Sequence, residues 1–312
     1  MFFELGWVEL QRYPSCRGDA GPPQQLAVHA PQCAAVPSEV ETFFFFAGSL
    51  ARAAATCKIT CIVDEFAVTG GVLGEPVELV QAKTVDVRVP AHAEFVIEGR
   101  LRVNDRESEG PFGEYPWYYG PERKGHIMDV TAITHRNDAI YHDVFSAHRD
   151  HNMCAKIQRE AVVYKRVRMV IPGVKAVCLP VSGACRHVAY LSMRKDFDGQ
   201  GKIAALAALA ADTLMKMVVV VDDDIDVENE SEVWWAVTTR TQADRAIFMV
   251  PESYVGELDP SSHSLKDRNE RGYLNTKWAI DATKPVGIPF EERADVPPDV
   301  WSSMDLGDYL KG

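Results

Sequence analysis

The chain has no Cys-x-x-Cys pair, no internal repeat and no low-complexity tract. Its seven cysteines are scattered along 312 residues. An odd number of widely spaced cysteines does not fit a disulfide framework, and the missing pair spacing does not fit a zinc site. The sequence therefore predicts reduced thiols. The cysteines stand at positions 16, 33, 57, 61, 154, 178 and 185.

Long apolar runs are also missing. The longest, residues 43–50, is soon followed by Arg52, whereas a bilayer-spanning helix needs roughly 20 apolar residues. We interpret this run as a buried strand. The N-terminus lacks the basic stretch and apolar core of a secretory signal. The sequence thus predicts a cytoplasmic protein without a membrane span.

Positively charged residues are fewer than negatively charged ones. The chain has 33 Lys and Arg against 45 Asp and Glu, and its net charge is −12. This balance repels a polyanionic backbone, which argues against nucleic acid as a partner. A small anionic substrate stays compatible with it, because a local basic pocket can outweigh the global charge.

The length is sufficient for two domains, each with its own core. In the first half, alternating apolar and polar residues predict strands, and Gly-Pro pairs separate them. This half is expected to form a β-rich barrel or a strongly bent sheet. The predicted strands cover residues 84–89, 95–103, 127–133 and 140–145.

The second half mixes helices with strands. Helical spacing of apolar residues runs over 152–169 and ends at Pro172-Gly173, which predicts a helix between two domains. The other predicted helices cover 201–216 and 229–240, and the predicted strands cover 174–179, 187–193, 217–221 and 247–250.

Two acids five residues apart, Glu109 and Glu114, flank a Gly-Pro-Phe-Gly turn. Gly and Pro permit a sharp reversal, so both side chains can reach one cavity. In a partly dry pocket, repulsion and lost hydration raise the pKa of one carboxyl group. One acid then holds a proton while the other stays ionised, as proton delivery requires. Spacing alone favours the simpler alternative, a surface turn with two solvated glutamates.

The hexapeptide EGPFGE at 109–114, followed by Tyr118-Tyr119, closely resembles the signature of the UbiD decarboxylases. Further blocks resemble the family in the same order, and chance does not explain such a series. They include DEFA at 64–67, GEPVELV at 74–80, IEG at 97–99, VVVDDDID at 219–226, VWWA at 233–236 and IDAT at 280–283.

The resemblance implies a carboxy-lyase that uses prenylated FMN, and it assigns roles to individual residues. Glu114 matches the family's proton donor, and Glu109 matches a member of a Glu-Arg-Glu network beside the flavin. Glu65 matches a ligand of a divalent metal, Mn²⁺ with K⁺ as a second candidate ion, that bridges to the flavin phosphate. Lys216 and Pro111 are expected to contact the cofactor, Lys216 at its phosphate. Taken alone, Glu65 is a surface acid and Lys216 a helix-end cation.

The same resemblance implies an α+β fold. Residues 1–150 are expected to form a β-rich split-barrel domain that binds the prenylated flavin, 151–171 a linker helix, and 172–312 an α/β oligomerisation domain. It also implies a homodimer or larger homo-oligomer, with a flavin prenyltransferase as cofactor supplier. The expected substrate is a small carboxylic acid: a hydroxybenzoate, a heteroaromatic acid or an acrylic acid.

The N-terminal part departs from the family pattern. The family's metal site adds an Asn and a His, and its network adds an Arg, all upstream of the DEFA block. The first asparagine of this chain is Asn104, and Gln25 stands where the His is expected, with His29 four residues further on. Arg12 and Arg17 are candidates for the network arginine.

These departures leave alternatives open. The family's N-terminal domain has no clear counterpart in this chain, which predicts a truncated or altered member with an incomplete cofactor site. Such a chain is either a decarboxylase, active or inactive as it stands, or a non-catalytic remnant or scaffold subunit of the same fold. A flavin protein of other chemistry, such as a reductase, is a third alternative, and it would not need the acid pair.

Two polar segments have both a functional and a structural interpretation. Residues 147–152 (AHRDHN) open the predicted linker helix. They are expected to cap it through Asp150 or Asn152 rather than to contact substrate. Residues 222–226 (DDDID) suggest a metal site, but their place in the oligomerisation domain favours a structural role.

Overall fold

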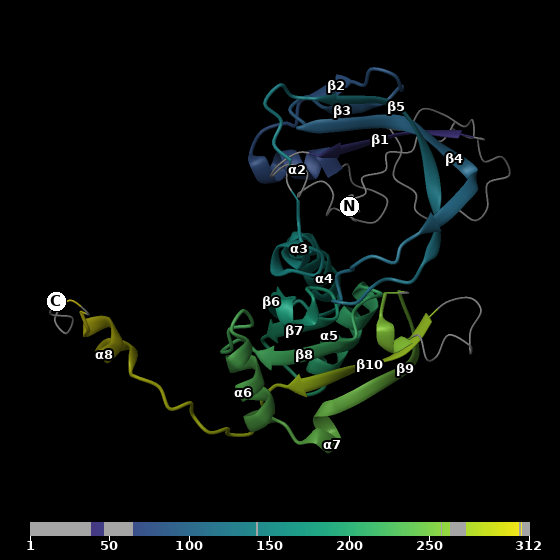
Figure 1. Ribbon diagram of the computed structural model, residues 1–312. Coiled ribbons are helices and arrows are strands. Elements are labelled where there is room, and N and C mark those ends of the chain that lie inside the picture. The colour runs from purple at the N-terminus through teal and green to yellow at the C-terminus, as the bar shows by residue number, and fades with distance from the viewer. Residues whose placement is uncertain are drawn as a thin grey trace, which may run out of the picture.

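The computed structural model describes residues 39–46, 65–141, 143–256, 258–262, 273–305 and 307. Figure 1 shows two halves, each built on a sheet, with helices α3 (Arg149–Cys154) and α4 (Lys156–Val170) where the chain passes from one to the other. Helices and strands are both present, which confirms the mixed α and β class. No helix in the described part of the chain could cross a bilayer.

The first half contains a three-stranded antiparallel sheet in the order β1-β4-β5. Two irregularities in the β4–β5 pairing, at residues 98–99 and 102–106, bend these long strands. Figure 1 shows both strands running down from the sheet toward the second half. Closure of these strands into a split barrel stays a prediction. The bounds are β1 Glu39–Phe46, β4 Phe95–Glu109 and β5 Arg123–His135.

The strand predicted over 84–89 is wrong for most of its length, since only Arg88–Pro90 (β3) pairs, with Leu79–Gln81 (β2). The cause is Glu98, whose side chain is buried on β4 at 1% exposure. Its carboxylate accepts hydrogen bonds from the backbone N–H groups of Lys83 and Thr84 at 3.0 and 2.6 Å. Burial raises the pKa of Glu98, but these bonds outweigh it and lower the pKa. The two N–H groups are therefore bound to a side chain instead of a neighbouring strand.

Two further sequence expectations in this half differ from the structure. Residues 140, 141 and 143–145 form no strand. Residues 65–73 form helix α2 (Glu65–Leu73), which we did not predict. Its sequence contains two adjacent glycines and no basic residue in the last turn, so the usual helix signals are weak.

The second half is a five-stranded sheet in the order β6-β7-β8-β10-β9, with the central pairs β7–β8 and β8–β10 parallel. Strand β8 is apolar at every position but the last because both its faces are covered. Val218 and Val220 pack on the side of α4 and α5, whereas Val219 and Val221 pack on the side of α6. The strands are β6 Val174–Cys178, β7 Val188–Met193, β8 Met217–Asp222, β9 Ile247–Val255 and β10 Tyr273–Ala282; the helices are α5 Gln200–Ala211, α6 Glu230–Arg240, α7 Ala243–Ala246 and α8 Pro298–Ser303.

Two cationic side chains form ion pairs with the acidic run at 222–226. Arg240 Nη1 lies 2.9 Å from Asp222 and 2.8 Å from Asp224, and Lys284 Nζ lies 2.8 Å from Asp224. The hydrogen bond from Arg240 is the main reason that the pKa of Asp224 falls to about 2. These ion pairs give the run a structural role and connect β8 to the segment after β10. Beyond them, Figure 1 shows the chain running away from the sheet to α8.

Helix α5 ends at Ala211, five residues before the predicted end, and a buried lysine caps it. Lys277 on β10 is 6% exposed, and its Nζ donates to the carbonyl oxygens of Leu209, Asp212 and Thr213 at 3.1 to 3.2 Å. Carbonyl groups at a helix end have no partner within the helix. The lysine therefore gives a charged donor to three carbonyl groups at this helix end, of which that of Asp212 also accepts from the Met215 N–H at 3.1 Å.

We expect Lys277→Met to lower the free energy of unfolding by about 3 kcal/mol, because three carbonyl groups lose a charged donor while the apolar stem is kept. Lys175→Met on β6, the edge strand of the same sheet, is the control, since Lys175 is exposed. Urea unfolding measures both. Equal stability of the two variants would contradict the capping role.

Candidate functional site

The loop that carries the two acids joins β4 to β5 and folds back on itself. Gly113 and Tyr119 form an antiparallel bridge, and the Gly120 N–H donates to the Phe112 carbonyl at 2.9 Å. Within this hairpin the Glu114 N–H donates to the Tyr118 carbonyl at 3.0 Å. Glu109 is the last residue of β4, and Gly110, with φ of 88°, begins the reversal. We name residues 109–122 the acid loop.

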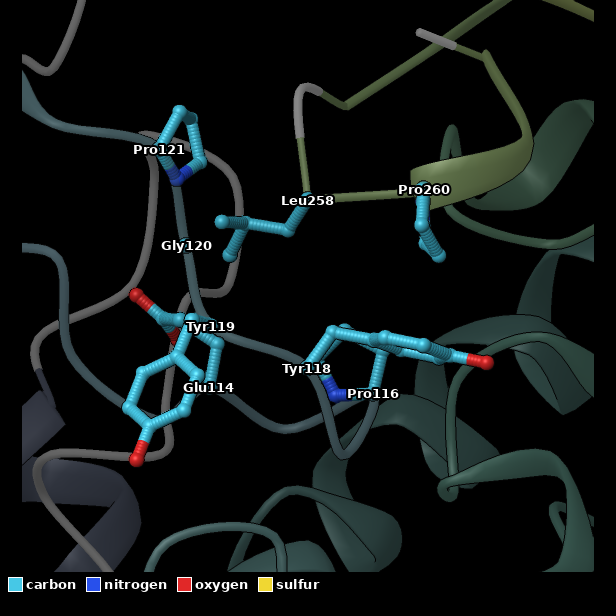
Figure 2. Close-up of a pocket in the computed structure, with 8 residues that line it drawn as sticks. All are labelled: Glu114, Pro116, Tyr118, Tyr119, Gly120, Pro121, Leu258 and Pro260. Carbon is cyan, nitrogen blue, oxygen red and sulfur yellow. The ribbon is translucent and has the colours of Figure 1, made fainter.

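Glu114 lines a pocket between the acid loop and a segment of the second half (Figure 2). Figure 2 shows Leu258 and Pro260 on one side of this pocket, with the loop residues on the other. The pocket is small, with a volume of about 10 Å³, and a methyl group at Gly120 would come within 3.1 Å of Glu114 Cγ and 3.5 Å of Leu258 Cδ2. Glu114 is half-buried. The lining is Glu114, Pro116, Tyr118, Tyr119, Gly120, Pro121, Leu258 and Pro260.

Glu109 does not line this pocket. It lies opposite Arg123, the first residue of β5, and Arg123 Nε is 3.4 Å from Glu109 Oε2. The two acids therefore belong to one loop but have different surroundings. Glu109 is paired with a cation, whereas tyrosine and proline side chains and Leu258 surround Glu114 in the pocket. Pro111, which directly follows Gly110, is exposed.

The acid loop is held against the second half by Tyr115, the residue after Glu114. Tyr115 is 5% exposed, and the Arg186 guanidinium lies 4.2 Å from the centre of its ring. The His187 ring packs beside it at 5.4 Å between centroids. Burial raises the pKa of Tyr115 to about 12, so the phenol stays protonated. Its hydroxyl is buried without a hydrogen-bond partner among the described residues.

Asn152 connects this contact to helix α3. Its amide nitrogen donates to the Ala147 carbonyl at 3.1 Å and to the Tyr115 carbonyl at 3.4 Å, and its oxygen accepts from Arg186 at 3.0 Å. The expected capping role is therefore wrong for Asn152, whose side chain is fully buried. The N-cap of α3 is His148, without a side-chain cap bond.

His151 belongs to the same junction. Its Nδ1 accepts a hydrogen bond from the Ala147 N–H at 2.9 Å, which requires an unprotonated nitrogen. Burial and then the nearby Arg186 lower the pKa of His151 to about 4. The sequence signal for this junction was the polar segment 147–152, but nothing in the sequence indicates that it meets Tyr115 and Arg186.

Lys216 lies in the second half just before β8, where Asp259 holds its ammonium group. Lys216 Nζ is 2.9 Å from Asp259 Oδ2 and 2.8 Å from Ser261 Oγ. Burial raises the pKa of Asp259, and its bonds to Lys216, Ser261 and Asn275 outweigh this and lower it. Asp259 stands between Leu258 and Pro260, so the ion pair anchors one wall of the pocket. Lys216 itself is not among the residues that line the pocket.

Of the metal site expected around Glu65, the structure describes only the backbone of Glu65. Glu65 is the first residue of α2, and its side chain lies outside the described part, as do Arg12, Arg17, Gln25 and His29. In the described ranges one group has metal-ligand spacing, Glu160, Cys178 and Glu228. Lys156 already binds that group, at 2.8 Å from Glu228, and burial raises the pKa of Cys178 to about 12. A protonated thiol beside an ammonium group is a poor metal ligand.

The described cysteines, Cys154, Cys178 and Cys185, are free thiols, as predicted. The other four lie outside the described residues.

We expect Tyr115→Ala to lower the free energy of unfolding by about 3 kcal/mol, since it removes a buried ring. Tyr115→Phe should keep or raise stability, because it removes a buried hydroxyl that has no partner. Urea unfolding of both variants tests the packing, and a large loss in the phenylalanine variant would show that the hydroxyl has a partner.

His151 predicts a pH dependence of stability. Its native pKa lies below the unfolded value of about 6.5, so the unfolded chain takes up the proton first. The free energy of unfolding should therefore fall as the pH drops from about 6.5 to 4, by about 2 kcal/mol after allowance for partial exposure.

His151→Asn keeps an acceptor and removes the titration, so its unfolding free energy should lose this part of the decline. His148→Asn, at an exposed neighbour, should keep it. Parallel curves for wild type and His151→Asn would contradict the assignment.

Two family models match the chain. The 3-octaprenyl-4-hydroxybenzoate carboxy-lyase Rift-related domain (UbiD) covers residues 41–149, and the corresponding C-terminal domain (UbiD_C) covers 152–282. Among curated proteins, an uncharacterized protein of Archaeoglobus fulgidus is 36% identical over 234 residues, 74% of this chain and 47% of its own length. The anhydromevalonate phosphate decarboxylase of Methanothermobacter thermautotrophicus is 35% identical over 233 residues, 75% and 53% of the two chains.

Solved structures agree with these matches. The UbiD-class enzyme HmfF of Pelotomaculum thermopropionicum, in complex with FMN, has a TM-score of 0.79 at 40% identity, over 87% of this chain and 60% of its own. An evolved dimeric form of it, in complex with prFMN, has a TM-score of 0.73 at 37% identity, over 87% and 58%. The apo 3,4-dihydroxybenzoic acid decarboxylase of Klebsiella pneumoniae has a TM-score of 0.73 at 27% identity, over 88% and 59%.

The chain spans about half the length of the curated relatives it matches. The matched residues nevertheless include the acid loop, the junction around Tyr115 and all five strands of the second sheet. On the two domain matches and the shared fold, this chain belongs to the UbiD family.

Proposed function

We propose that the chain catalyses the reversible, non-oxidative decarboxylation of an aromatic, heteroaromatic or α,β-unsaturated carboxylic acid, with prenylated FMN as cofactor and Glu114 as proton donor. The observation that supports this most is the position of Glu114 in a pocket between the two halves. The FMN and prFMN complexes of HmfF and the names of the decarboxylase relatives support the cofactor and the reaction.

In this proposal the bond between the substrate carbon and its carboxylate breaks, CO₂ leaves, and a C–H bond takes its place. When bound, prenylated flavin supplies an electron sink for the pair left on carbon. Glu114 holds a proton on its carboxyl group and transfers it to that carbon. No net oxidation occurs. Glu109 lies beside Arg123 at the base of the same loop.

The described residues fit only part of the cofactor. The acid loop supplies both carboxyl groups and the exposed Pro111. The Lys216 ammonium is already bonded to Asp259 and Ser261, so a contact with the flavin phosphate would have to be shared with these groups. For Mn²⁺, or K⁺, the proposed ligand is Glu65, whose side chain lies outside the described residues. The proposed reaction therefore includes no step at a metal ion.

A second candidate function is a non-catalytic subunit that keeps the fold without a complete cofactor site. The pairing of Lys216 with Asp259 favours it. In either case we propose a cytoplasmic homo-oligomer, at least a dimer through residues 172–312. As an enzyme it would depend on a flavin prenyltransferase for its cofactor.

We expect Glu114→Gln to lower turnover by at least about 100-fold, because the amide has no proton to donate, while the thermal midpoint stays within a few degrees. The protein is co-expressed with a flavin prenyltransferase and assayed for CO₂ release. The substrates are 3,4-dihydroxybenzoic acid and anhydromevalonate phosphate, taken from the relatives' names. Glu122→Gln, an exposed acid of the same loop, should keep wild-type turnover.

Near-normal turnover of Glu114→Gln would remove the donor role. A wild-type protein that purifies without flavin absorbance and releases no CO₂ would favour the non-catalytic subunit instead.

A further inference from the structure

The first acid of the loop has a charged partner that the sequence did not indicate. Glu109 ends β4 and Arg123 begins β5, and the two residues are directly opposite in the antiparallel ladder. Arg123 Nε lies 3.4 Å from Glu109 Oε2, with side-chain exposures of 37% for the arginine and 33% for the glutamate. Opposite residues of a ladder are within side-chain reach. The ion pair therefore closes the base of the acid loop.

A glycine on β5 makes room for the Glu109 side chain. A Cβ atom at Gly125 would lie 2.6 Å from Glu109 Oε2 and 3.2 Å from Glu109 Cβ. Real Cβ atoms do not approach an oxygen so closely, so any other residue at 125 would displace the carboxylate. The Glu109 side chain thus lies over the bare backbone of β5, next to Arg123.

Arg123 also contacts the interior of the loop. Its guanidinium lies 5.8 Å from the centre of the Phe112 ring, within the range of a cation–π contact. Phe112 is half-buried, and its carbonyl accepts the hydrogen bond that closes the hairpin at Gly120. One side chain therefore touches both the first acid and the residue whose backbone shapes the turn around the second.

The energy of such a contact bears on its role. Ion pairs at this level of exposure contribute little to folding, so stability alone gives a weak reason for this arrangement of arginine, glycine and glutamate. Arg12 and Arg17 lie outside the described residues. Arg123 is the arginine that the structure places against Glu109.

We propose that Arg123 is a positioning residue that holds the Glu109 carboxylate over Gly125 and thereby fixes the geometry of the acid loop for proton transfer by Glu114. The inference rests on the proposed decarboxylation for its kinetic consequence, but the positioning itself is a property of the protein without cofactor. Its two consequences can therefore be tested separately.

The first test uses crystal structures of the full chain without cofactor, as wild type and as Arg123→Gln and Arg123→Lys. We expect the Glu109 carboxylate to leave the surface of Gly125 in the glutamine variant and to stay there in the lysine variant, which keeps the charge. Lys124→Gln, an exposed neighbour on the same strand, should leave Glu109 in place. A carboxylate that keeps its wild-type position in Arg123→Gln would overturn the proposal.

The second test uses the protein co-expressed with a flavin prenyltransferase. Arg123→Gln should lower kcat about 10-fold or more, with KM within about threefold of wild type and an unchanged thermal midpoint, and Arg123→Lys should restore part of the loss. The double variant Arg123→Gln/Glu109→Gln should be no slower than Glu109→Gln alone, because the arginine acts through the glutamate. Full additivity of the two losses would overturn the proposal.

Gly125→Ala is a further variant, because it displaces Glu109 without touching Arg123. It should reproduce the kinetic loss of Arg123→Gln, and wild-type kcat in this variant would count against the role of the carboxylate position. If the wild-type protein proves inactive, the proposed function fails, and the crystal structures still decide whether Arg123 positions Glu109.

Discussion

The packing of Tyr115 between Arg186 and His187 is the contact on which the site depends. The acid loop grows out of two strands of the first half, yet its central residue is buried against the second half. Without this anchor, a loop of glycines, prolines and exposed aromatic side chains would have few constraints on the position of Glu114. Asn152 strengthens the anchor because it binds the backbone of the loop and the side chain of Arg186 at once. The position of Glu114 is therefore a property of both halves together.

The two carboxyl groups of the loop show how one short motif creates different environments. Glu109 lies at a strand end, with the Arg123 guanidinium beside it. Glu114 lies four residues into the turn, in a pocket lined by Tyr118, Leu258 and Pro260. This asymmetry places a cation beside one acid and apolar side chains beside the other. Here the ladder of β4 and β5 and the contact between the halves create it, rather than the spacing of the motif alone.

The sequence predicted the family and most of the second half correctly, because those signals are local. Strand β8 is a continuous apolar run, and the ordered blocks along the chain identify the family without any knowledge of contacts. Contacts between residues distant in the chain were not predictable. The loop at 82–87 follows the buried Glu98 rather than its own alternation. The position of the Lys216 ammonium group depends on Asp259, 43 residues away. The contact of Arg123 with Glu109 depends on the pairing of β4 with β5.

Asp259 determines which half of the molecule carries the wall that faces the acid loop. Asp259 binds Lys216 before β8 and Asn275 on β10, at 2.9 and 3.2 Å. The segment with Leu258 and Pro260 is therefore attached to two strands of the second sheet. The opposite wall is the acid loop, which Tyr115 holds against the same half. Both walls beside Glu114 are therefore attached to the second half, although the strands that carry the acid loop belong to the first.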